Sequence, residues 1–226
     1  MTTAKDSTLS TLQQERDELS RRLNDALARL ASSDAGTFSM ASPDSGPQHD
    51  QNVLAFRRLK LQDFQALSLA VYSIWQKKSG SDAVKPGHAL ALCREKLSHE
   101  VLVEGSKLLA IRRSASADAD LQEVSRAIYE SIRTRFKMRN QPPAELGEKI
   151  KTTITRSLEL LRAMSLARPA AFLLVPAHRT PFTPELHEAV VGCPERAPAA
   201  VQFTVFPGYL VASSNRVLEK ALVYSE

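Results

Sequence analysis

Apolar positions recur at helical spacing from the start of the chain to about residue 168, and the spacing becomes strand-like after that. In residues 1–31 the apolar positions step alternately by three and four residues, as in the a and d positions of a coiled coil. These positions are Leu9, Leu12, Leu19, Leu23, Ala26 and Leu30, with Arg16 in one slot. About three heptads are marginal for an isolated helix in water. We therefore predict a coiled-coil arm that forms a homodimer through its five leucines. The alternative is one amphipathic helix that packs on its own chain.

Residues 32–52 are rich in Ser, Asp, Gly and Pro and contain almost no aliphatic side chains. Such a segment cannot bury enough apolar surface to offset the entropy that ordering would cost. We predict a flexible linker there.

Four amphipathic stretches follow, in Val53–Lys78, His88–Arg112, from Asp118 or Asp120 to Phe136, and Ala144–Ala167. The third and fourth have the cleanest stripes, since nearly every third or fourth residue is Leu, Ile, Val or Phe. Four such helices in succession predict a helical body over residues 53–168.

After Pro169 the pattern changes. Ala171–Val175 is short and apolar and predicts a buried strand. We predict a short helix over Pro184–Val190, capped by Thr183. Val201–Val211 and the run 217–223 predict the last strands, with a turn at Pro207-Gly208. The expected fold class is α+β and predominantly α: a coiled-coil arm, a four-helix body and a small β-domain over residues 169–226.

The composition bears on where the protein is located and on whether it holds a disulfide or a metal. The chain is 43% hydrophobic, yet no apolar run reaches the roughly 20 residues that a membrane span needs. Its start lacks the pattern of a signal peptide. Cys93 and Cys193 lie far apart, without a C-x-x-C or flanking histidines, so we expect neither a disulfide nor a zinc site. We expect a cytoplasmic protein that has no membrane segment.

The net charge of +5 is unevenly distributed. Residues 1–50 contain five Lys/Arg and eight Asp/Glu, while residues 51–226 contain 25 Lys/Arg and 17 Asp/Glu. A basic body can attract nucleic acid or an acidic protein surface. The clusters at 57–60 and 133–139 come without any nucleic-acid-binding motif, so we interpret them as solvated helix ends. Nucleic-acid association is the third functional hypothesis, and we expect no such binding.

No arrangement of residues indicates catalysis. His187 lies beside Glu188, but on a helix adjacent side chains point about 100° apart. The chain contains no G-x-S-x-G, no H-E-x-x-H and no glycine-rich phosphate loop. We therefore predict a protein that is not an enzyme and that holds no cofactor or metal.

The last part of the chain resembles the end of the GrpE family, the nucleotide-exchange factors of DnaK-type chaperones. The resemblance covers roughly Phe182–Tyr224, under a fifth of the sequence. Glu219-Lys220 stands where the family has Arg-Pro. The matching residues are Phe182, Pro184, His187, Glu188, Ala189, Val190, Gly208, Tyr209, Arg216, Val217, Leu218 and Ala221.

The resemblance implies a co-chaperone that binds a DnaK-type ATPase through its β-domain and promotes nucleotide exchange. Pro207-Gly208-Tyr209 has two interpretations: a turn in which Gly208 takes a positive φ and Tyr209 covers the core, or part of the binding face. The alternative function is a self-associating helical scaffold or adaptor in a multiprotein assembly. The candidate partner-binding residues are Phe182, Pro184, His187, Glu188, Gly208, Tyr209, Arg216 and Leu218.

Overall fold

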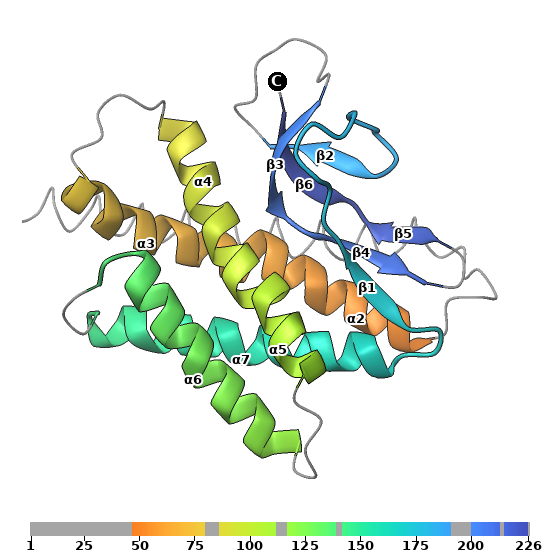
Figure 1. The fold of residues 1–226 in the computed structure, drawn as a ribbon, viewed down its shortest axis with the longest axis horizontal. Helices are drawn as coiled ribbons and strands as arrows, with labels where there is room; N and C mark the ends of the chain where they lie inside the picture. Colours follow the sequence, from red (N-terminus) through yellow and green to blue (C-terminus); the bar gives the residue numbers. More distant parts are fainter. Residues whose placement is uncertain are drawn as a thin grey trace, which may run out of the picture. The chain divides into compact units, whose positions relative to one another are not determined.

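Four helical segments precede the strands in the computed structural model, which describes residues 47–79, 86–111, 117–138, 142–190, 200–212 and 215–225. The predicted arm and its five leucines lie outside these residues. The segments follow one another as α2 (Pro47–Arg58), η1 (Leu59–Asp63) and α3 (Phe64–Ser79), then α4 (Pro86–Ser98), η2 (His99–Glu104) and α5 (Gly105–Ile111), then α6 (Ala117–Arg135) and α7 (Ala144–Leu166) (Figure 1). A predominantly helical α+β fold is confirmed.

The first helix begins at Pro47, inside the segment 32–52 for which we predicted a linker. That prediction was wrong for its last six residues, because two polar side chains there are buried. His49 Nδ1 lies 2.9 Å from the Tyr209 hydroxyl, and Asn52 is also buried. Residues that read as polar linker in the sequence therefore form the first turns of a packed helix.

Two π-helical turns, η1 and η2, interrupt the first two helical segments. A π-turn carries more residues than an α-turn, so it shifts the buried face of the helix. In η1 the neighbours Leu59 and Lys60 are both buried, and in η2 three successive residues are buried: Glu100, Val101 and Leu102. The periodicity of the sequence did not reveal either turn.

Six strands follow α7: β1 (Ala171–Leu174), β2 (His187–Ala189), β3 (Val201–Phe206), β4 (Gly208–Val211), β5 (Arg216–Glu219) and β6 (Ala221–Ser225). They form one sheet in the order β1-β4-β5 and another in the order β2-β6-β3. β3 and β4 are separated only by Pro207, and β5 and β6 only by Lys220. The hairpin 201–225 thus bends at these two positions and contributes to both sheets.

The helices and the strands share one hydrophobic core. Phe206 of β3 packs edge-on against Phe56 and Phe64, with ring centroids 5.3 and 5.1 Å apart. Tyr209 of β4 packs against Phe56 at 5.7 Å. Residues 46–226 accordingly form one compact unit. The two domains that we separated at residue 168 mark the change from helices to strands, and both sides belong to this unit.

Candidate functional site

The GrpE-like residues 182–190 form a turn and a strand. We predicted a helix over Pro184–Val190, which is wrong: a turn at Pro184–Leu186 leads into β2. β2 runs parallel to β6, with His187 opposite Ala221. Backbone bonds from Ala221 N to Leu186 O and from Val190 N to Val223 O, 3.0 and 2.9 Å, hold the segment against β6. Pairing with a distant strand outweighs the weak helical preference of seven residues.

His187 lies in the interior at the start of β2. Only 3% of its surface is exposed, and its Nδ1 accepts a hydrogen bond of 3.0 Å from the Thr183 N–H. The Phe182 ring lies 5.7 Å away. Burial lowers the pKa of His187, which favours the neutral ring that this hydrogen bond requires. The side chain thus stabilises the turn and is not accessible to a partner in this conformation.

Gly208 lies at the bend between β3 and β4. We expected a positive φ there, and the structure does not have one. The reason for glycine is a close approach of the two bent strands: a Cβ at this position would lie 2.7 Å from Glu219 O and 2.8 Å from Ala221 N. Such distances fall well inside van der Waals contact, so only a residue without a side chain fits.

Tyr209, the next residue, is fully buried. Its hydroxyl bonds to His49, and burial raises the pKa of Tyr209 above its ordinary value. The structure thus agrees with the interpretation of Pro207-Gly208-Tyr209 as a turn in that both Gly208 and Tyr209 are buried against the core, although Gly208 has no positive φ. Neither presents a surface to a partner.

A cluster of charges joins helix η1 to the bend of the hairpin. Lys60 Nζ lies 2.7 Å from Glu188 Oε2 and 3.0 Å from Glu219 Oε1, and it also donates to Lys220 O at 3.3 Å. Arg57 Nε lies 2.6 Å from Glu219 Oε2. The Lys60 side chain is only 3% exposed, whereas that of Glu188 is 55% exposed. Together with Arg94, these side chains form three cations and two carboxylates that we call the Lys60 cluster: Arg57, Lys60, Arg94, Glu188 and Glu219.

Arg94 of α4 completes the Lys60 cluster. Its guanidinium donates to Lys60 O and lies over the Phe206 ring, 5.8 Å from the centroid. Burial lowers the pKa of Arg94 to about 10, and the nearby charge of Glu188 opposes that change. We had interpreted Arg57 and Lys60 as part of a solvated cluster. Spacing could have corrected this, because Lys60 lies four residues from both Phe56 and Phe64 on one helical face.

The remaining candidate residues lie at or near the surface. Pro184, Glu188 and Arg216 are exposed, while Phe182 and Leu218 are half-buried. β2 pairs only with β6 and β5 only with β4, so both are edge strands. The eight predicted residues therefore divide into five that a partner can reach and three, His187, Gly208 and Tyr209, that shape the strands from within.

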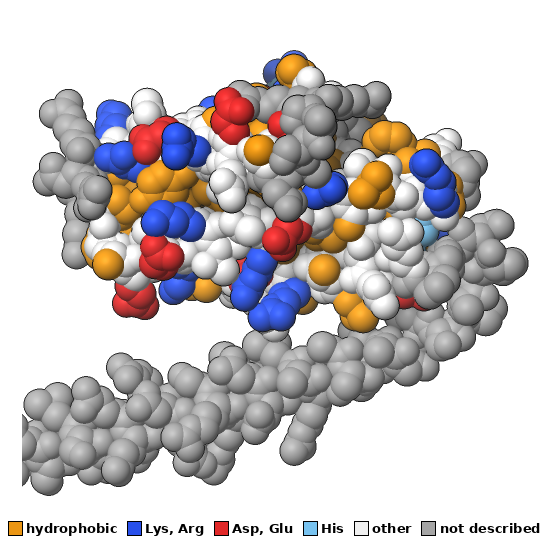
Figure 2. Space-filling view, turned by 90° about the horizontal axis from the view of Figure 1, so that it is seen from below, with side chains coloured by type: hydrophobic (Ala, Val, Ile, Leu, Met, Phe, Trp, Pro, Cys, Tyr) orange, Lys and Arg blue, Asp and Glu red, His pale blue; other side chains and the backbone are white. Residues whose placement is uncertain are grey.

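The described part of the chain contains no group of three or more His, Cys, Asp or Glu that could hold a metal ion. Cys93 is a free, buried thiol whose pKa burial raises to about 12, so it is a poor nucleophile. No helix within the described ranges is long and apolar enough to cross a membrane. On the face seen in Figure 2, Lys and Arg side chains lie among Asp and Glu and form no continuous basic stripe.

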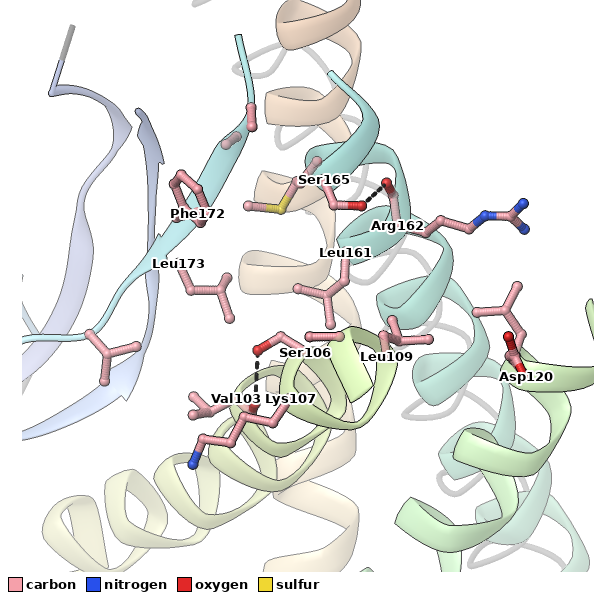
Figure 3. Close-up of a pocket in the computed structure, with 16 residues that line it drawn as sticks. Val103, Ser106, Lys107, Leu109, Asp120, Leu161, Arg162, Ser165, Phe172 and Leu173 are labelled. Atoms are coloured by element: carbon pink, nitrogen blue, oxygen red, sulfur yellow. Dashed lines mark hydrogen bonds between the residues drawn. The ribbon is translucent and has the colours of Figure 1, made fainter. Parts of the chain in front are cut away.

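A groove of about 860 Å³ lies beside β1, and none of the five residues of the Lys60 cluster lines it. Its walls come from α5, the C-terminal part of α7 and β1, and Figure 3 shows Leu109, Leu161 and Leu173 around it. Phe172 and Val175 lie in its strand wall and are exposed. We predicted a buried strand at Ala171–Val175, and its burial was wrong for Phe172 and Val175, because an exposed phenylalanine reads in sequence like a buried one.

Scans of family models, curated proteins and solved structures find no significant match to this chain.

Proposed function

We propose that the chain is a GrpE-like co-chaperone of the cytoplasm. It binds the nucleotide-binding domain of a DnaK-type ATPase through its strands and promotes nucleotide release without catalysing a reaction itself. An exchange factor acts by binding the open form of the ATPase more tightly than the nucleotide-closed form.

One observation carries this proposal: the two parts of the resemblance lie side by side. His187–Ala189 pairs with Ala221–Val223, and Lys60 binds both Glu188 and Glu219. The residues that match GrpE at 182–190 thus belong to the sheet β2-β6-β3, and most of those at 208–221 belong to the sheet β1-β4-β5, which the Lys60 cluster and the bend at Lys220 join to it. Among the candidates, we assign the chaperone contact to the accessible side chains of Phe182, Pro184, Glu188, Arg216 and Leu218.

The test is release of a fluorescent ADP analogue from the host's DnaK-type ATPase, with and without the full chain. We expect faster release in its presence. Arg216→Glu should weaken the effect, because it reverses an exposed charge on edge strand β5. Lys149→Glu, an equal change at an exposed position on α7, should leave it intact. No acceleration at concentrations well above that of the chaperone would exclude the proposal.

A scaffold or adaptor is the second candidate, and the outer face of the first helical segment favours it. This face exposes Leu54, Leu61 and Leu69, and Arg58 is the one charged residue among the exposed residues described between 51 and 73. The exposed positions of α7 are mostly charged by comparison. Charge-poor faces with exposed leucines are typical of interfaces. Leu61→Glu should abolish assembly if the protein is a scaffold and spare nucleotide release if it is a co-chaperone.

A further inference from the structure

The outer edge of β1 has unused backbone hydrogen-bonding groups. β1 pairs on one side only, with β4. Ala170 O accepts a bond of 3.0 Å from Ala212 N, and the register places Ala171 opposite Val211. Because bonded and non-bonded pairs alternate along an antiparallel ladder, the N–H and C=O of Ala171 and Leu173 point away from β4. No backbone bond among the described residues uses them.

These groups lie along the groove beside β1. Residues 170–173 and Val175 all line it, and α5 and α7 form the opposite wall (Figure 3). That wall is mostly apolar, with Leu109, Leu161 and Met164. The groove therefore offers a row of backbone donors and acceptors together with apolar walls. An extended segment satisfies both, since its backbone pairs with the edge and its alternate side chains enter the groove.

The charged side chains around β1 indicate which charges an extended segment bound there would carry. Arg168 is exposed three residues before β1. Among the residues that line the groove, Lys107 and Arg162 are cations and Asp120 is the one acid (Figure 3). Lys107 pairs at 2.8 Å with Glu104, which is a surface pair that a ligand carboxylate can join. Arg179, also exposed, follows β1. Strand β1 thus has cations before and after it, and it carries no charge itself.

We propose that this groove binds an extended segment of a partner protein, which adds to β1 as a further strand. The segment is apolar at alternate positions and acidic at its ends. A second copy of this chain fits less well. Antiparallel pairing of two β1 strands would bring Arg168 of one copy towards Arg179 of the other, and like charges across an interface are unfavourable. This proposal is independent of the co-chaperone function.

The probe is a fluorescein-labelled nine-residue peptide in which three valines alternate with two serines between pairs of glutamates. We expect saturable binding to the full chain by fluorescence anisotropy. Two further peptides carry N-methyl groups, one on the valines and one on the serines. One of the two should bind at least about tenfold more weakly, because it lacks the N–H groups that face β1. A version with lysines at both ends should also bind more weakly.

Two variants with matched exposure locate the site. Phe172 and Leu54 are each 55% exposed, the first in the groove and the second on α2. Phe172→Lys should weaken peptide binding at least about tenfold, and Leu54→Lys should not change it. Ala110→Trp, which places a large side chain in the groove from α5, should have the same effect as Phe172→Lys. Thermal unfolding of each variant verifies that it folds.

Three results would overturn the proposal. The first is equal binding by both N-methylated peptides and the parent peptide. The second is equal binding by the Phe172→Lys, Ala110→Trp and Leu54→Lys proteins. The third is self-association that Phe172→Lys abolishes in a protein that binds no peptide, which would assign the groove to a second copy of the chain.

Discussion

At the scale of single residues, Gly208 shows how one missing side chain permits the bend of the hairpin. Gly208→Ala adds a Cβ within 2.8 Å of two backbone atoms, Glu219 O and Ala221 N, which cannot move without disturbing the β5–β6 bend. We predict that the free energy of unfolding falls by about 1–3 kcal/mol, the usual range for overpacking. Urea unfolding followed by circular dichroism measures it.

Gly87→Ala is the matched control for this substitution. Gly87 lies near the start of α4, and a Cβ there would meet nothing within 4 Å. Alanine favours a helix over glycine, so this variant should lose no stability. Equal stability of the two variants would contradict the close approach at Gly208.

At the same scale, we predict that His187 makes the free energy of unfolding depend on pH. Burial depresses the folded-state pKa of His187 below its unfolded value of about 6.5. The unfolded state then binds more protons in this range, so stability is fully present above the unfolded pKa and falls as the pH drops towards the folded pKa. We expect the free energy of unfolding to fall between pH 7.5 and 5.5. His187→Asn, whose side-chain oxygen can still accept the Thr183 N–H, should show a smaller fall. An unchanged slope in that variant would show that other groups cause it.

At the scale of elements, the Lys60 cluster connects η1 to β2 and to the β5–β6 bend. Lys60→Met removes the cation that pairs with Glu188 and leaves Glu219 paired with Arg57. We predict a loss of about 3 kcal/mol, the lower end for breaking a buried pair, because Glu188 is half exposed to water. Hydrogen exchange in residues 187–189 should also increase.

Lys151→Met provides the comparison, since Lys151 pairs with Glu148 at 2.8 Å on the exposed side of α7. A surface pair contributes little, so its loss should leave unfolding almost unchanged. Similar urea midpoints for the Lys60 and Lys151 variants would mean that the Lys60 cluster does not hold the strands to the helix.

The elements also show how far the sequence alone reaches. The helices 86–111, 117–135 and 144–166 and the strand at Ala171 were predicted closely, because each has a regular apolar period. The π-turns, the turn and strand at 184–189 and the early start of α2 were not. The turn and strand depend on pairing with β6, where His187 lies opposite Ala221, 34 positions away. The start of α2 depends on the contact of His49 with Tyr209, 160 positions away, and each π-turn depends on added residues in a helix. None of these contacts leaves a periodic signal in the sequence. The sequence alone also could not show which of the candidate site residues are exposed. His187 and Glu188 are neighbours, yet His187 is buried and Glu188 is exposed.

At the scale of the molecule, the shared core makes the helices and strands of residues 46–226 depend on each other. Phe206 and Tyr209 complete a core that begins with Phe56 and Phe64, so removal of the strands would expose aromatic rings on the helices. Residues 182–190 and 208–221 are therefore supported by packing against the helical part. A partner that binds the edges of β2 and β5 would bind strands already fixed in place, at little cost in ordering them.

The oligomeric state belongs to the same scale and tests the sequence outside the described residues. The stripe Leu9, Leu12, Leu19, Leu23 and Leu30 precedes a polar segment, and we predict that it pairs with a second copy. The full chain should be a dimer by light scattering. Deletion of residues 1–31 should give a monomer whose helical body is intact, because residues 46–226 form a compact unit without that arm. Leu19→Asp should have the same effect, since a charge at the seam must lose water or open the seam. If the deletion variant remains a dimer, the exposed Leu54, Leu61 and Leu69 of the first helical segment become the candidate interface. Leu61→Glu in that variant should then give a monomer if this face is the interface.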